Sequence, residues 1–109
     1  MTETLKVLGQ SAPGAATPAV LYTVPAATST VVSSLVVCNQ SAVATSFRVS
    51  VSLAGAATVA KDYLYYDLAI SGNNTFTAVL GISLATTDVV RVYATLATLS
   101  FSLFGLERT

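Results

Sequence analysis

The stretch that decides the fold is Ser46-Phe47-Arg48-Val49-Ser50-Val51-Ser52-Leu53, in which polar and apolar side chains alternate without a break. Successive side chains of a β-strand point to opposite faces of the sheet, so this period of two gives the strand one apolar and one polar row. The apolar row comprises Phe47, Val49, Val51 and Leu53. We therefore expect a strand of an antiparallel sheet, with the apolar row in a core and the Ser and Arg row facing a polar environment.

The same alternation recurs in three further stretches, which predict three more strands with one buried face. The expected inward sets are Leu64, Tyr66, Leu68 and Ile70, opposite Tyr63, Tyr65 and Asp67; Phe76, Ala78, Leu80 and Ile82; and Leu99, Phe101 and Leu103. Residues 4–8, 20–24, 31–38 and 88–94 are rich in Val, Thr, Tyr or Leu, the types that suit a pleated surface. About eight short strands, spaced about ten residues apart and separated by turn residues, predict an all-β fold. We expect a single antiparallel β-sandwich of jelly-roll-like type.

The sequence allows more specific predictions for three local features. Residues 58–62 are the one place where a helical turn fits the sequence, but the segment is too short for a stable helix, so we expect a loop or strand lead-in. Asp88 is expected to accept backbone N–H bonds in the turn that precedes it. Cys38 lies in an apolar run and is expected to be a small buried side chain. Its strand, residues 31–38, is apolar on both faces near its end, so it is either central in the sandwich or in contact with another subunit.

The length of 109 residues fits one domain spanning residues 1–109. Only 9% of the residues are charged, whereas 53% are hydrophobic. A membrane-spanning helix needs about 20 mostly apolar residues, and Pro13, Pro18 and Pro25 interrupt the long uncharged region. We therefore expect no membrane contact. Residues 1–10 are expected to form either an arm or an edge strand that contacts a neighbour.

The residue types that catalysis and cofactor binding need are scarce in this chain. There is no His and no Trp, which excludes a Ser-His-Asp triad and a histidine metal ligand. The five acidic residues are scattered, and no glycine-rich phosphate loop is present. Five basic residues balance the five acidic ones, so the clustered positive charge that nucleic acid needs is missing. We expect a protein that is not an enzyme, with no cofactor, no metal ion and no nucleic-acid partner.

The remaining candidate site residues are candidates for protein contact: Tyr63, Tyr65, Leu5, Val7, Arg48 and Arg91. Tyr63 and Tyr65 are expected to point away from the core, and exposed tyrosines are enriched in contact surfaces. The alternative is that they cover the edge of the second sheet within the same domain. Arg48 and Arg91 lie mid-strand on a non-core face, where each is either solvated or paired with an acid of a neighbouring chain. Because a neutral surface with few charges promotes association, we expect copies of the chain to cover much of it.

Several segments together resemble a group of small tailed-phage virion structural proteins. They are KVLGQ at residues 6–10, LYTVPA at 21–26, VSSLVVCN at 32–39, LATTDVVRVYA at 84–94 and LSFSLFGLE at 99–107. The similarity spans nearly the whole chain and follows strands and turns. It departs from the pattern at Thr87, where a Gly usually precedes the aspartate. The resemblance implies a β-sandwich that assembles, often as a trimer, on the outside of a particle, and it carries no catalytic residues.

This resemblance favours a capsid cement or decoration protein. Such a protein would be made in the host cytoplasm and located on the outer capsid surface of the virion. Its partners would be other copies of itself, as a homotrimer, and the major capsid protein, over whose subunit junctions it would bind. The alternative is a receptor- or glycan-binding module of a tail fibre or baseplate, with a host-surface glycan as ligand. A sugar-binding or enzymatic domain unrelated to phages is disfavoured, because His, Trp and acid clusters are missing.

Overall fold

In the computed structural model, residues 2–109 form eight β-strands and two single-turn 3₁₀ helices. The strands are β1 (Glu3–Ser11), β2 (Ala19–Thr23), β3 (Ser29–Asn39), β4 (Thr45–Ser52), β5 (Tyr63–Ile70), β6 (Thr75–Leu84), β7 (Val89–Ala94) and β8 (Leu99–Arg108). The 3₁₀ helices, Leu53–Gly55 and Ala60–Asp62, both lie between β4 and β5. All eight expected strands are confirmed. Within residues 2–109, no helix is long and apolar enough to span a membrane.

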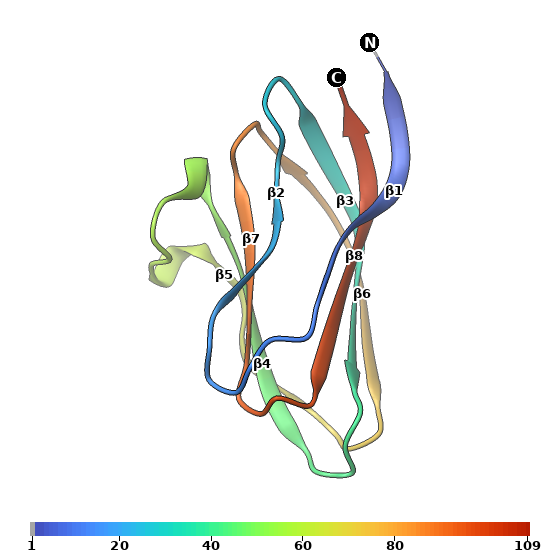
Figure 1. Cartoon of the computed structure of the whole chain (residues 1–109), viewed down its shortest axis with the longest axis vertical. Helices are drawn as coiled ribbons and strands as arrows, with labels where there is room; N and C mark the ends of the chain where they lie inside the picture. The colour runs from blue at the N-terminus through green and yellow to red at the C-terminus, as the bar shows by residue number, and fades with distance from the viewer. Residues whose placement is uncertain (1) are drawn as a thin grey trace.

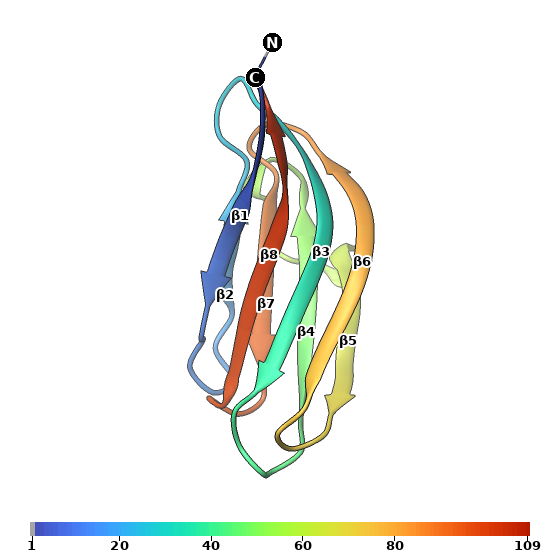
Figure 2. The ribbon, with the colours of Figure 1, turned by 90° about the vertical axis from the view of Figure 1, so that its right-hand side faces the viewer.

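The strands pair into two four-stranded antiparallel sheets that face each other (Figure 1). Their orders are β1-β8-β3-β6 and β2-β7-β4-β5, so most connections cross from one sheet to the other. Figure 2 shows the first sheet in front of the second, with both chain ends at the same end of the sandwich. This confirms the expected β-sandwich of jelly-roll-like order. Residues 1–10 were expected to form an arm or an edge strand; residues 3–10 belong to edge strand β1, and Met1 lies outside the described residues.

The inner faces of both sheets supply the core. Phe47 of β4 and Phe101 of β8 are fully buried, with ring centroids 5.9 Å apart and an edge-to-face orientation. The inward sets expected for β6 and β8 are confirmed: Leu99, Phe101 and Leu103 are buried, and Phe76, Leu80 and Ile82 pack against the same cluster. Such alternation puts about half of each strand's side chains in the core, which accounts for the period of two in the sequence.

Strand β5 contradicts the prediction in its first half. Tyr65 packs against the core, whereas Leu64 and Tyr66 are exposed. The cause is two register shifts against β4: Phe47 pairs with Leu68, but Val49 pairs with Tyr65 and Ser50 with Tyr63. Each shift inserts an extra residue into β5, and an extra residue reverses which face the following side chains occupy. Tyr63 therefore points outward as expected, and Tyr65 points inward, against the expectation.

Four further expectations need correction or refinement. Leu53 is exposed and not part of the core, because β4 ends at Ser52 and the chain turns into the first 3₁₀ helix. Cys38 is only half-buried, since it lies on the outer face of β3 while Val37 beside it points into the core. Strand β3 itself is central in its sheet, between β8 and β6. The helical turn between β4 and β5 exists as a single 3₁₀ turn, Ala60–Asp62, inside a longer loop.

A polar contact joins the two sheets near the chain ends. The hydroxyl of Tyr22 in β2 donates a hydrogen bond of 2.5 Å to Glu107 Oε2 in β8 and lies 2.8 Å from Thr30 Oγ1 in β3. Lys6 Nζ donates to the other carboxylate oxygen of Glu107 at 3.2 Å. The hydrogen bond from the Tyr22 hydroxyl is the main cause that lowers the pKa of Glu107, and the contact with Lys6 lowers it further. Burial, and then Glu107, raise the pKa of Tyr22 to about 12.

The Glu107 contact predicts an acid-dependent loss of stability. A carboxyl whose pKa is lowered on folding stabilises the fold above its ordinary pKa, here 4.5, and this contribution is lost as the pH falls through the lowered value. Glu107→Gln should lower the free energy of unfolding at neutral pH by about 1.5–3 kcal/mol, as for other hydrogen bonds to charged groups. The difference from wild type, measured by urea denaturation at several pH values, should shrink as the pH falls below 4.5. A difference that stays constant with pH would contradict this assignment.

Gly105 in β8 lies where two strands approach too closely for a side chain. A Cβ atom at this position would be 2.2 Å from Val31 O and 3.0 Å from a methyl of Leu8. Gly105→Ala should therefore force β3 and β8 apart and lower the free energy of unfolding by about 1–3 kcal/mol. Gly14→Ala is the matched control, because the nearest atom to its added Cβ is 3.8 Å away. Equal urea midpoints for the two variants would be inconsistent with this packing.

Candidate functional site

The outer face of the β1-β8-β3-β6 sheet carries exposed apolar side chains in two rows across the strands. In the first row, Leu5 pairs with Leu106, and Leu106 pairs with Val31. In the second row, Val7 pairs with Phe104 and Phe104 pairs with Ser34. Ser34 in turn pairs with Val79, where the row ends. We call the surface made of Leu5, Val7, Val31, Val79, Phe104 and Leu106 the apolar face. Exposure reaches 81% for Leu5 and 88% for Val79, and such contiguous apolar surface marks interaction sites in soluble proteins.

The surroundings of the apolar face define its limits. At the end near the chain termini, Arg108 forms an ion pair with Glu3 across β8 and β1. At the opposite end, the rows give way to Ser and Thr side chains of β6 and β8. On the β6 side, residues Thr75–Leu84 contain no charged residue and no proline, two of the usual devices that prevent an edge strand from pairing with another chain; its pairing with β3 is irregular near Gly81.

The outer face of the other sheet has a different chemistry, centred on Arg48 of β4. Its Nε and Nη2 donate hydrogen bonds of 2.6 and 3.3 Å to the two carboxylate oxygens of Asp67. Its guanidinium carbon lies 4.2 Å from the ring centroid of Tyr66 and 4.4 Å from that of Tyr93, a double cation–π contact. The hydrogen bonds from Arg48 lower the pKa of Asp67, and Asp67 raises the pKa of Arg48. The irregularity in β5 makes this cluster, because Tyr66 and Asp67 together face Arg48 between two paired positions.

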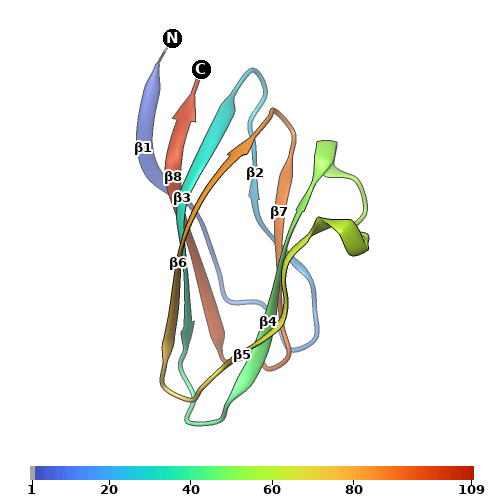
Figure 3. The same cartoon turned by 180° about the vertical axis from the view of Figure 1, so that it is seen from behind.

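Residues 53–62 form a loop that covers part of the same face, on the outside of β4 and β7 (Figure 3). Arg91 of β7 holds the loop: its guanidinium donates to the carbonyls of Gly55 and Ala56 and to the hydroxyls of Thr58 and Ser52. Ser50 and Ser52 of β4 were expected to face a polar environment, but both side chains are buried on this side of the sheet.

Two aspartates hold the ends of the same loop. Asp88 accepts hydrogen bonds from the backbone N–H groups of Ala85 and Ala54. The expected role of Asp88 in its own turn is therefore confirmed, and it also fixes the loop. Asp62 accepts from the N–H of Val59 at 3.0 Å and from the Ser52 hydroxyl at 3.4 Å. The loop is thus tied to the sheet at both ends and by Arg91 in the middle.

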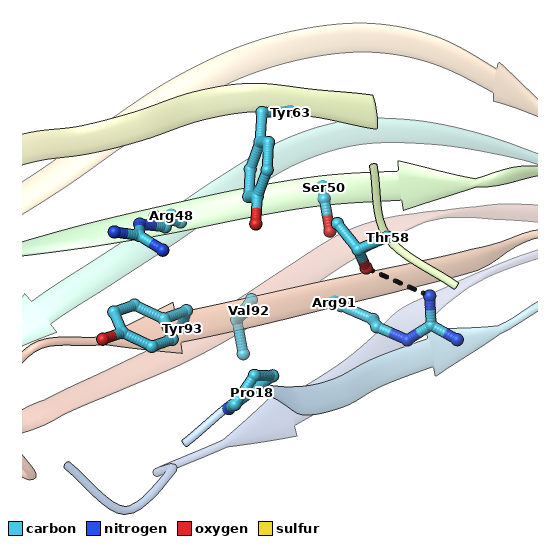
Figure 4. A pocket seen from close by; sticks show the side chains of 8 residues that line it. All are labelled: Pro18, Arg48, Ser50, Thr58, Tyr63, Arg91, Val92 and Tyr93. Carbon is cyan, nitrogen blue, oxygen red and sulfur yellow. Dashed lines mark hydrogen bonds between the residues drawn. The ribbon is translucent and has the colours of Figure 1, made fainter. Parts of the chain in front are cut away.

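Between the loop and the sheet lies a small hollow of about 100 Å³ (Figure 4). Arg48 and Tyr93 line one end, Arg91 and Thr58 line the other, and Tyr63 points its hydroxyl toward the middle. We call it the arginine–tyrosine hollow. A wider and more open depression adjoins it and shares Thr58 and Tyr63, with Tyr66 and Val59 on its far side.

The structure divides the sequence-predicted contact residues between these two surfaces. Leu5 and Val7 lie on the apolar face, whereas Tyr63, Arg48 and Arg91 line the hollow. Tyr65 belongs to neither, because it is packed against the core. Arg48 pairs with Asp67 of its own chain, and Arg91 bonds its own loop, so neither needs an acid from a neighbour. Within residues 2–109, no group of three or more acidic or cysteine side chains is placed to hold a metal ion.

The roles of several residues of these surfaces could not be predicted from the sequence. Val79 faces outward as alternation predicts, but a lone valine does not indicate its role until the register places it in the same row as Phe104, on the other side of Ser34. Tyr66 was expected in the core and is 60% exposed. No glycine marks the irregularity that turns Tyr66 outward; the positive φ of 52° falls on Asp67 instead.

Replacing Arg91 is expected to destabilise the loop 53–62 locally and not the whole fold. Arg91→Met removes four hydrogen bonds from a charged donor, so residues 53–62 should open at least about tenfold more often. Trypsin cleavage after the exposed Lys61, followed by mass spectrometry, should accelerate by the same factor when opening is fast. Arg108→Met is the control, because Arg108 lies on the other sheet and contacts Glu3. Equal cleavage of both variants would show that Arg91 does not hold the loop.

No protein-family model matches this chain, and neither a curated protein nor a solved structure matches it. The chemistry of the two outer faces of the sandwich is therefore the basis on which a function can be proposed.

Proposed function

We propose that this protein is a phage virion structural protein that binds the outer capsid surface as an oligomer and stabilises the shell. The observation that carries the proposal is the apolar face, where Leu5 and Val79 expose most of their side chains. Burying such surface against a neighbouring subunit is favourable by about 25 cal/mol per Å² of apolar area. A protein that works through this face needs no catalytic group.

Two further features support an assembling protein. The low charge of the chain, 9%, reduces the electrostatic repulsion that keeps separate copies apart. Val79 lies on the uncharged edge strand β6, so a neighbour that contacts the apolar face also protects this edge. The resemblance to small tailed-phage virion proteins and the occurrence of jelly rolls among viral capsid proteins point to a particle as the place of assembly. We propose a homotrimer that contacts the major capsid protein.

The apolar face predicts which substitutions prevent assembly. Val79→Glu and Leu5→Glu each place a charge where the proposed interface excludes water, which costs several kcal/mol per unpaired ion. Light scattering after size exclusion should give a mass of three chains for wild type and of one chain for both variants. Val43→Glu is the matched control, because Val43 is also exposed but lies in the loop between β3 and β4. A wild type that stays monomeric at high concentration would contradict the proposal.

The location on the particle has its own test. Quantitative mass spectrometry of purified virions should count hundreds of copies for a capsid protein and tens for a tail component. Virions carrying Val79→Glu should lose most of their copies, whereas Val43→Glu virions should keep them. A count of tens in wild-type virions would place the protein in the tail and overturn the capsid assignment.

A further inference from the structure

We propose that the arginine–tyrosine hollow is a binding site for an acidic saccharide, whose carboxylate lies between Arg48 and Arg91 while its sugar rings pack on Tyr63 and Tyr66. This site lies on the outer face of the β2-β7-β4-β5 sheet, opposite the apolar face. The proposal does not depend on assembly, because every residue of the hollow belongs to one chain.

The two arginines provide the charge that an acidic ligand needs. A guanidinium has five N–H donors, and Asp67 takes two of those of Arg48. The acceptors of Arg91 are two carbonyl and two hydroxyl oxygens, so no carboxylate is among these partners. The guanidinium groups of Arg48 and Arg91 both line the hollow, and Asp67 is the one carboxylate that is hydrogen-bonded directly to either of them. Hydrogen bonds from arginine to a ligand carboxylate are charge-assisted and stronger than those to neutral acceptors.

A hydroxyl group at the wall of the hollow suits the same ligand. Ser50 lines the hollow, and its hydroxyl, unlike those of Thr45 and Thr98, is not a fully buried oxygen without a partner in residues 2–109. Figure 4 shows this side chain at the hollow, near Thr58. A serine hydroxyl both donates and accepts, so at the wall of a hollow it can exchange hydrogen bonds with a ligand polar atom or a water molecule. A saccharide, whose surface is dense in hydroxyl groups, supplies such atoms.

The tyrosines and the adjoining depression favour a saccharide over a small anion. Tyr63 and Tyr66 stand edge to face, with centroids 4.9 Å apart, and Tyr66 remains 60% exposed although Arg48 covers part of its ring. The C–H faces of a sugar ring pack on such aromatic surfaces. The hollow of about 100 Å³ holds little more than a carboxylate group, but the depression of about 640 Å³ beside it accommodates further sugar units.

The site is also rigid before any ligand binds. Arg48 is fixed by Asp67 and two rings, and Arg91 is fixed by the loop. The loop between β4 and β5 has ten residues, 53–62, where most hairpin connections have two to five. It includes Ala54 at a φ of 53°, a conformation that costs energy for a residue other than glycine. Fixed binding groups lose little conformational entropy when a ligand binds, which increases affinity.

The test uses the purified protein and trigalacturonic acid as the acidic probe. The neutral control is its methyl ester, which keeps the rings and hydroxyls and removes the charge. Amide chemical shifts in NMR titrations should move around Ser50, Tyr63 and Arg91, with affinity at least about tenfold higher for the acid than for the ester. Acetate and a triglutamate peptide test the other sources of a carboxylate. If either binds as tightly as trigalacturonic acid, or if the acid causes no shifts at millimolar concentration, the proposal is wrong.

Matched variants assign the binding to the hollow. Arg48→Gln and Tyr66→Ala should each weaken trigalacturonic acid binding by about tenfold. Arg108→Gln is the control, because Arg108 is likewise paired with a carboxylate, Glu3, but lies on the other sheet. Arg108→Gln and the assembly variant Val79→Glu should bind as wild type does. Equal losses of binding in Arg48→Gln and Arg108→Gln would indicate a general charge effect and overturn the proposed site. A wild type that binds trigalacturonic acid but does not assemble would contradict only the proposed function and not this site.

Discussion

Phe47 occupies the place where the two sheets contact each other, and its ring organises the aromatic part of the core. Its centroid lies 5.9 Å from that of Phe101, 5.4 Å from Phe76 and 6.2 Å from Tyr65. The fourth ring, Tyr65, reaches the core only because β5 departs from regular pairing with β4. The same departure turns Tyr66 outward. Core packing and the arginine–tyrosine hollow are therefore two results of one irregular strand.

The two outer faces of the sandwich separate two kinds of chemistry. The first sheet leaves aliphatic side chains such as Leu5 and Val79 uncovered and Phe104 half-buried, and it has ionic groups mainly at one end. The second sheet is partly covered by the loop 53–62, and arginines and tyrosines gather at the hollow beside this loop, although Val20 and Leu64 of the same sheet are also exposed. Because the faces point in opposite directions, the proposed contact through the apolar face would leave the hollow open to the solvent. The proposed assembly and the proposed ligand binding would then not compete for the same surface.

Periodicity in the sequence was sufficient where strands are regular and failed where they are not. The faces of β6 and β8 follow a strict period of two, so Phe76 and Phe101 could be assigned to the core from the sequence. In β5 the extra residues carry ordinary side chains, and Asp67 takes the left-handed backbone conformation without a glycine to indicate it. The role of Arg91 was also hidden, because its acceptors lie 33–39 positions away in sequence and include backbone carbonyls. Contacts of this kind depend on the tertiary fold and leave no local pattern.

The pairing of β8 between β1 and β3 has a consequence for the order of events during synthesis. Thr2 and Thr109 exchange backbone hydrogen bonds of 3.1 and 2.9 Å, so this sheet closes only when segments about a hundred residues apart meet. Contacts of such high sequence separation form slowly, and β8 leaves the ribosome after all the other strands. Phe104 and Leu106 both belong to β8, so a nascent chain lacks the middle of the apolar face. Under the proposed assembly, only a chain that has completed its fold would present the whole surface to a neighbour, and unfinished copies would not associate prematurely.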